Sequence, residues 1–347
     1  MTFPGPEPRA PFQGRIGLWG APQSGKTTFL AALRVAVDQG ESDWWLHGSN
    51  DASTDFLTDM THQLITLRQF PAATLNLPPN LQWVFRGERE VRRRTRFGLT
   101  RTEREVTAIM LDLLDAPGGM YRGDSRRSNA APSGRVQFHD DDGADAGDGR
   151  KDLSEEERLI DHLVSCDGLI YLFDPTRERS RRDSYDYFQR TVMQLAQRAA
   201  GRSRDRFLPH HLAVCITKFD HPYVYEPAHR LGYADNTTKD EGFPTVPDAL
   251  AAELFSVLCA SDVQNSAVLL DKGIRTSFSP DRTRYFMTSA VGFYLDPKVR
   301  RFQPAQPWNV VEETGPEGDT TRILGGVHPI NVIEPLVWLA TATLPRS

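Results

Sequence analysis

The chain has 347 residues, of which 39% are hydrophobic and 25% are charged, and its formal net charge is −5. This composition is that of a globular protein with ample length to bury a core. The negative balance gives no general attraction to nucleic acid or to an anionic membrane, so we expect neither as a partner. The sequence has no run of 18 apolar residues, so we expect no membrane insertion.

The N-terminal segment and the cysteines of the chain indicate a cytoplasmic protein. Residues 1–14 contain four prolines and no apolar segment of the signal-peptide kind, so we predict a flexible leader there. None of the three cysteines, Cys166, Cys215 and Cys259, has the spacing of a metal site. We predict that they are buried free thiols, which fits the reducing cytoplasm.

Strand-like and helix-like segments alternate from residue 15 onward. This pattern predicts a three-layer α/β fold, with a mostly parallel sheet of about six strands and helices on both faces. The predicted strands are Ile16–Trp19, Leu81–Phe85, Val106–Leu114, Gly168–Phe173, His211–Ile216 and Arg284–Thr288. The predicted helices are Thr27–Asp38, Ser53–Arg68, one starting at Ser154, Tyr185–Ala199, Pro247–Cys259 and Asn331–Leu344, the last with Asn331 and Glu334 as a capping box.

The segments between these elements are long. We expect one domain over 15–344, with a disordered insertion at 120–151 that contains six aspartates and little to bury, and loop-rich insertions at 221–246 and 293–326. Asp174 is expected to be a turn residue before Pro175. The run 86–104 holds eight arginines and three glutamates. This run is interpreted either as a solvated hairpin or as a source of charge for catalysis.

The most informative motif is Gly20–Thr27, which has the form G-x-x-x-x-G-K-[ST] between a predicted strand and a predicted helix. That context is what a phosphate-binding loop requires, because loop N–H groups and the positive helix end then face the phosphate. A chance glycine turn is the alternative. The predicted phosphate-binding residues are Gly20, Ala21, Pro22, Gln23, Ser24, Gly25, Lys26, Thr27 and Thr28, with Lys26 on the β- and γ-phosphates and Thr27 on magnesium.

Asp115–Gly118 follows a predicted strand and has the form D-x-x-G. An acid in that position can hold magnesium through a water molecule, and the glycine N–H can meet a γ-phosphate. The same tetrapeptide is also a common turn, so the motif depends on its place after a strand and downstream of the phosphate loop.

Two further motifs point to the base of a nucleotide. Thr217–Asp220 reads [NT]-K-x-D directly after a predicted strand. The carboxylate of Asp220 could accept hydrogen bonds from the N1–H and the exocyclic amine of guanine, which adenine cannot offer in the same arrangement. The stem of Lys218 could lie along the base. Backbone N–H groups in Thr288–Ala290, including Ser289 and Ala290, could contact the guanine oxygen. A surface turn is the alternative for each motif.

Four motifs in this order, each after a predicted strand, resemble those of the Ras-like (TRAFAC-type) P-loop GTPase superfamily. The long insertions and the closing segment Pro329–Trp338 resemble more narrowly the bacterial double-GTPase families of conflict-system gene clusters. The resemblance implies that the protein hydrolyses GTP to GDP with Mg²⁺. It also implies a switch that acts on an effector protein or a second GTPase subunit, with a nucleotide-dependent dimer as one form. The implied catalytic residues are Lys26, Thr27, Asp115 and Gly118, and the implied metal ligands are Thr27 and Asp115.

The chain departs from the family pattern at two places. Gly119 stands where a glutamine often orients the attacking water, so hydrolysis could be slow. The threonine that completes the magnesium site in the GTP state is among Thr74, Thr95, Thr100 and Thr102, and we favour Thr74. A non-hydrolysing nucleotide-gated scaffold and a P-loop ATPase or kinase therefore stay open as alternatives.

Overall fold

A seven-stranded sheet forms the centre of the computed structural model, with strand order β2-β3-β4-β1-β5-β6-β7. The sheet is parallel from β4 to β7, whereas the β2–β3 and β3–β4 pairs are antiparallel. The strands are β1 (Gly14–Gly20), β2 (Trp44–Gly48), β3 (Gln82–Arg94), β4 (Thr100–Leu113), β5 (Gly168–Phe173), β6 (His211–Ile216) and β7 (Thr283–Met287). The structure describes residues 14–40, 43–71, 81–94, 100–113, 155–201, 206–234, 242–261, 266–298, 301–315 and 318–343.

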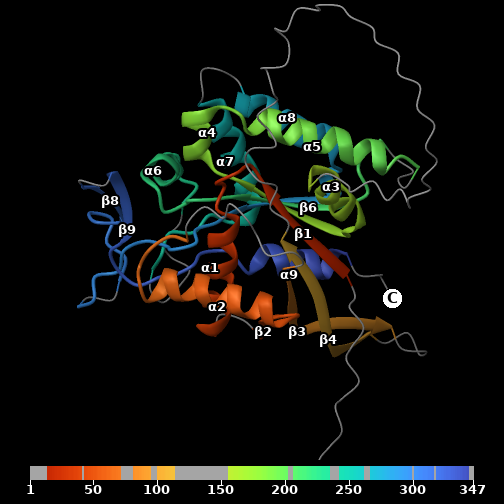
Figure 1. The fold of residues 1–347 in the computed structure, drawn as a ribbon, viewed down its shortest axis with the longest axis horizontal. Helices are drawn as coiled ribbons and strands as arrows, with labels where there is room; N and C mark the ends of the chain where they lie inside the picture. Colours follow the sequence, from red (N-terminus) through yellow and green to blue (C-terminus); the bar gives the residue numbers. More distant parts are fainter. Residues whose placement is uncertain are drawn as a thin grey trace, which may run out of the picture.

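Helices cover both faces of the sheet (Figure 1). One face packs against α1, α2 and α9, and the other against α3, α5, α7 and α8. The helices are α1 (Lys26–Asp38), α2 (Asp51–Ile65), α3 (Glu155–Ser165), α4 (Pro175–Arg181), α5 (Ser184–Arg198), α6 (Pro222–Arg230), α7 (Asp248–Ala260), α8 (Ser266–Ser277) and α9 (Glu334–Ala342). Among the described helices, none is long and apolar enough to cross a bilayer.

The central strand β5 is apolar at every position because both of its faces are covered. In β5, Leu169, Tyr171 and Phe173 point into the core with α3, α5 and α8. Ile170 and Leu172 point into the opposite core, with α1 and α9. The three-layer α/β architecture predicted from the sequence is therefore confirmed.

The β3–β4 hairpin extends well beyond its neighbours in the sheet. β3 pairs with β2 only as far as Gly87, and β4 pairs with β1 only from Ile109 onward. The outer part of the hairpin pairs with itself as far as Arg94, which lies opposite Thr100. The arginine-rich run thus forms an antiparallel hairpin, as one of the two interpretations predicted.

Several short elements were not predicted. They are β2, α4, α6, α8 and a separate antiparallel pair, β8 (Val310–Gly315) with β9 (Gly318–Ile323). The expected loops at 221–246 and 293–326 are therefore wrong in part. In α6, Pro222 fits the first turn and the His221 ring accepts a hydrogen bond from Tyr223 N (3.1 Å), so a local cap starts a helix that hydrophobic periodicity does not reveal. The expected insertion at 120–151 and the leader lie outside the described residues.

The predicted capping box of the last helix is wrong. α9 begins at Glu334, and its N-cap position is Ile333. Asn331 instead has a left-handed backbone (φ 54°), and its side-chain amide donates to the carbonyl of Met287 at 3.2 Å. The asparagine therefore ties the loop before α9 to the end of β7.

Trp83 offers a test of this packing. It is fully buried, and its Nε1 donates to Ser53 O of α2 at 3.0 Å, whereas Trp45 on the neighbouring strand is 65% exposed. We expect Trp83→Ala to lower the free energy of unfolding by about 3–5 kcal/mol through cavity formation. Trp45→Ala should change it by less than about 0.5 kcal/mol. Chemical denaturation followed by circular dichroism would measure both, and equal losses would contradict the packing described.

Candidate functional site

The predicted motifs that the structure describes gather at one edge of the sheet. β1, β5, β6 and β7 are parallel, so their carboxyl ends meet at this edge. β1 lies between β4 and β5, the point where successive strands are added on opposite sides of it. Ligands of open α/β sheets bind at such a switch point, and Gly20–Thr27 follows β1 there.

The loop after β1 has the backbone that a phosphate-binding loop needs. Gly25 has φ 92°, a left-handed conformation that favours glycine. A Cβ atom on Gly20 would lie 2.7 Å from the carbonyl oxygen of Leu172, so the loop packs too closely on β5 for a larger residue. Ser24 N donates to Ala21 O at 3.0 Å, which closes the turn before α1. These contacts explain both glycines of the motif.

The start of α1 is suited to an anion. Its N-cap residue, Gly25, makes no side-chain capping bond, and the first turn contains no acidic residue. The positive end of the helix dipole is therefore not offset by a local carboxylate. Thr27 and Thr28, which follow in this first turn, are half-buried.

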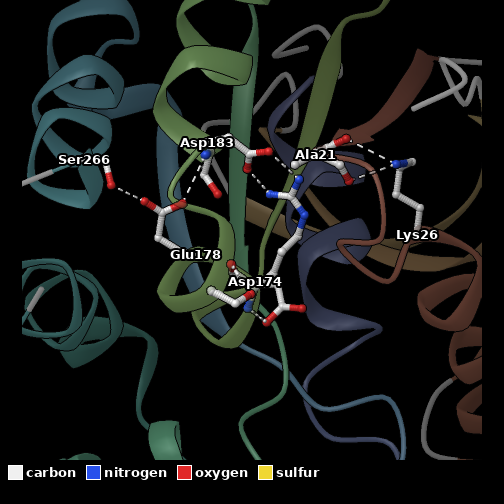
Figure 2. Close-up of polar contacts among 10 residues, drawn as sticks. Ala21, Lys26, Asp174, Glu178, Asp183 and Ser266 are labelled. Carbon is white, nitrogen blue, oxygen red and sulfur yellow. Dashed lines mark hydrogen bonds and ion pairs between the residues drawn. The ribbon is translucent and has the colours of Figure 1, made fainter. Parts of the chain in front are cut away.

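Lys26 brings a buried cation to the same place. The side chain is only 5% exposed, and its Nζ donates to the carbonyl oxygens of Gly20 and Ala21, each at 3.2 Å (Figure 2). The ammonium group thus folds back over its own loop. A phosphate group in the loop would offer a charged acceptor to the same nitrogen. A charged oxygen is a stronger acceptor than a neutral carbonyl.

The segments after β6 and β7 are joined by a buried carboxylate. Asp220 is 8% exposed, and its Oδ1 accepts a hydrogen bond from the hydroxyl of Ser289, which is fully buried. The Ser289 oxygen in turn accepts from Gly292 N at 2.8 Å and Val291 N at 3.3 Å. The loop after β7 therefore fixes the position of the Asp220 carboxylate.

Burial raises the pKa of Asp220 to about 6, and the hydrogen bond from Ser289 opposes that rise only in part. The hydrogen bonds that the carboxylate receives in the free protein therefore do not fully offset the cost of its burial. Additional N–H donors from a ligand would favour its ionised form.

Ser289 has a role that the motif did not predict. Its backbone N–H donates to Ile330 O at 3.0 Å, and the N–H of Thr288 donates to Ile216 O at 2.8 Å. The N–H groups of these two residues are therefore used inside the protein. Of the three residues in the motif, Ala290 is left to provide the expected amide contact with a base.

Two residues that the motifs did not single out lie beside Lys218. Asp174, at the end of β5, is 2% exposed and forms an ion pair with Lys218 Nζ at 2.8 Å. Lys218 Nζ also donates to Thr176 Oγ1 at 3.0 Å. Asp174 is the N-cap of α4, where it accepts from the backbone N–H groups of Thr176 and Arg177, so its prediction as a turn residue was wrong. The D-P-T sequence, an N-cap residue before proline, was the signal that could have revealed this helix start.

β4 leads to Asp115, the predicted magnesium ligand, and a buried carboxylate, Asp112, anchors this strand. β4 ends at Leu113, and Asp115, Gly118, Gly119 and Thr74 lie outside the described residues. Asp112 is 2% exposed, and its Oδ2 lies 3.1 Å from Arg15 Nε and 3.6 Å from His162 Nε2. Burial raises the pKa of Asp112, and Arg15 opposes this rise; burial lowers the pKa of His162 to about 4. These contacts tie β4 to β1 and α3.

Other metal chemistry has no support in the described part of the chain. Within it, no group of three or more His, Cys, Asp or Glu residues is placed to hold a metal ion. Cys166, Cys215 and Cys259 are all buried and free, as predicted. Burial raises the pKa of each thiol, so none of them has the character of a nucleophile.

Comparisons with known proteins give similarities among solved structures alone. No family model matches the chain, and no curated protein matches it. Among solved structures, the chain is similar to that of sup35 complexed with GDP, with 12% sequence identity and a TM-score of 0.27. The similarity covers 84% of this chain and 41% of the sup35 chain.

The raised pKa of Asp220 makes stability depend on pH. The pKa is about 6 in the folded protein, above the ordinary value of 3.8, so between these values the folded state keeps a proton that the unfolded state releases. Stability therefore falls as the pH rises through this window, by about 3 kcal/mol in total. Asp220→Asn can keep the bond from Ser289 without a charge. We expect this variant to be more stable than the wild type above about pH 6, with the difference vanishing below about pH 4.

Thermal or urea denaturation across this pH range would measure the effect. Asp183→Asn is a suitable control because Asp183 is half exposed and its partner is Arg177 rather than Ser289. Parallel pH profiles for the wild type and Asp220→Asn would show that the Asp220 carboxyl titrates normally.

Proposed function

We propose that this protein binds guanine nucleotides and hydrolyses GTP to GDP and phosphate with Mg²⁺. The observation that carries the proposal is the pairing of two sites at one sheet edge. A phosphate-binding loop follows β1, and a buried, under-compensated carboxylate, Asp220, follows β6. A nucleotide has the matching chemistry, with phosphates at one end and a hydrogen-bonding base at the other.

Selection of guanine follows from the hydrogen-bonding capacity of Asp220. The ionised carboxylate can only accept hydrogen bonds, and guanine offers the N1–H and the exocyclic amine side by side. Adenine offers no such pair, so it would leave the buried carboxylate without donors from the ligand, which is costly. This argument favours a GTPase over the alternative P-loop ATPase or kinase.

The phosphate end uses Lys26, the loop amides and the start of α1, with Gly118 as the proposed γ-phosphate contact. Mg²⁺ binds oxygen ligands and is commonly held by one or two protein groups together with phosphates and water. The hydroxyl of Thr27 in the first turn of α1 fits that donor set, and Asp115 and Thr74 are the other proposed ligands. Bound there, the ion would neutralise charge on the phosphate oxygens. Lys26 would do the same from the protein side.

We further propose that the protein acts as a molecular switch in the cytoplasm, on an effector protein or a second GTPase subunit, and that a nucleotide-dependent dimer is one such form. Support comes from the order of the four sequence motifs and from three buried free cysteines, which suit a reducing compartment. Membership of the conflict-system double-GTPase families rests on the resemblance of the insertions and of the closing segment.

Nucleotide selectivity tests the guanine proposal directly. We expect GTP and GDP to bind at least about tenfold more tightly than ATP. Asp220→Asn should reverse the order between guanine and xanthine nucleotides, because an amide can accept from N1–H and donate to the xanthine C2 oxygen. Calorimetric titrations with and without Mg²⁺ would measure both. Equal binding of ATP and GTP, with no gain for xanthine nucleotides, would contradict the proposal.

Hydrolysis is a separate test, because Gly119 has no side chain to orient a water molecule. We expect slow single-turnover release of phosphate from bound GTP, and loss of that release in Lys26→Ala, which removes charge stabilisation in the transition state. Release no faster than in Lys26→Ala would favour the alternative of a non-hydrolysing, nucleotide-gated scaffold.

A further inference from the structure

Asp174, at the end of β5, uses both of its carboxylate oxygens in the free protein. Its side chain is 1% exposed. Oδ1 accepts from Thr176 N (2.9 Å), Thr176 Oγ1 (2.7 Å) and Arg177 N (3.1 Å), while Oδ2 lies 2.8 Å from Lys218 Nζ. Lys218 also donates to Thr176 Oγ1, so Asp174, Thr176 and Lys218 form a closed set of polar contacts. A buried carboxylate with this many donors has a fixed orientation.

The helix that begins at Asp174 is itself held in place. Arg177 forms a two-pronged ion pair with Asp183, and Glu178 accepts hydrogen bonds from Ser184 N at 3.1 Å and from the hydroxyl of Ser266 on α8. Figure 2 shows Asp183 and Glu178 on this side of the site, with Ser266 reaching Glu178 from the neighbouring helix. These bonds tie α4, the helix that Asp174 caps, to α5 and α8.

Lys218 has a backbone fixed from both sides and a side chain that contacts Asp174 and Thr176. Its φ is 59°, a left-handed conformation that is uncommon outside glycine. Thr217 N donates to Phe173 O at 2.8 Å, and Phe219 N donates to Thr288 O at 3.0 Å. The side chain itself is 48% exposed, so without Asp174 and Thr176 it would sample many rotamers in water.

We propose that Asp174 is a positioning residue that sets the affinity for the nucleotide base by holding the Lys218 side chain in one orientation, with Thr176 as its second support. The inference rests on the proposed guanine-nucleotide function and concerns the base end of that site alone. A long side chain that is fixed before the ligand binds loses no further conformational entropy on binding. We expect this to raise the affinity by about tenfold. The phosphate loop is not in contact with Asp174 through any bond described above, so binding of phosphates should not depend on it.

The test compares GDP with inorganic pyrophosphate, which carries the phosphates and no base. We expect Asp174→Asn to weaken GDP binding by about tenfold and to leave pyrophosphate binding unchanged. Asp161→Asn is the matched control: it breaks the ion pair of Asp161 on α3 with Arg198 on α5, which involves neither α4 nor Lys218. It should leave the affinity for both ligands unchanged.

A double-mutant cycle then asks whether Asp174 acts through Lys218. In a Lys218→Ala background, Asp174→Asn should have no further effect on GDP affinity, because the group it positions is gone. Thr176→Val provides a second variant that keeps the Asp174 carboxylate and removes one contact to Lys218. It should weaken GDP binding in the same direction by a smaller factor, so the proposal stays testable if Asp174→Asn does not fold.

Three results would overturn the proposal. Equal weakening of GDP and pyrophosphate binding would mean that Asp174 shapes the whole site. A full effect of Asp174→Asn in the Lys218→Ala background would mean that it acts through another group. Tighter GDP binding by Asp174→Asn would mean that the ion pair holds Lys218 away from the base. Absence of GDP binding in the wild type, with pyrophosphate still bound, is distinct from these and would overturn the guanine proposal on which this one rests.

Discussion

Burial of charge at the carboxyl edge of the sheet is the constraint that organises the site. Lys26, Asp174 and Asp220 are each less than a tenth exposed, and a buried charge is costly unless other groups compensate it. Lys26 rests on two loop carbonyls, and Asp174 is surrounded by amides, a hydroxyl and the Lys218 ammonium. The Asp220 carboxylate accepts a hydrogen bond from the Ser289 hydroxyl, but burial outweighs its compensating contacts and raises its pKa to about 6.

The parallel sheet is what makes this concentration of charge possible. Backbone groups within the strands are satisfied by their neighbours, so polar demands collect where the strands end. At those ends the neighbouring loops bond to one another: Thr217 N reaches Phe173 O, and Thr288 N reaches Ile216 O. The loops after β5, β6 and β7 are thereby fixed relative to each other. Side chains that lie far apart in the sequence are held at hydrogen-bonding distance.

The sequence was sufficient for the main strands and for the loop after β1, because both depend on local patterns. Buried parallel strands such as Gly168–Phe173 and His211–Ile216 are continuous apolar runs, and their predicted bounds agree with those of β5 and β6. The glycines of Gly20–Thr27 are explained by backbone geometry that is local to the loop. Short elements such as α4 and α6 were missed because a cap and a proline define them, not a hydrophobic period.

Contacts between residues far apart in the sequence could not be predicted from the sequence. Lys218 and Thr176 are 42 positions apart, and Ser289 and Asp220 are 69 positions apart. A motif identifies the residue types at one strand end, but only the order of strands in the sheet decides which strand ends are neighbours. For that reason the sequence around Asp174 predicted a turn residue, whereas the structure shows a helix N-cap. Ser289 was predicted to contact the base through its backbone N–H, whereas in the structure its hydroxyl donates to Asp220.

The two ends of the site also differ in what a ligand would change. At the loop after β1, a bound phosphate would replace the neutral carbonyl partners of Lys26 with a charged partner. The lysine would stay buried. At the base end, a ligand with paired N–H donors would supply compensation that Asp220 lacks, so its gain comes from relieving a cost already present in the folded protein. An under-compensated carboxylate discriminates strongly, because a ligand without those donors would leave it buried and unsatisfied. The same feature that reduces stability would therefore give the proposed site its selectivity, and the ion pair of Lys218 with Asp174 holds a cation at the same edge of the sheet.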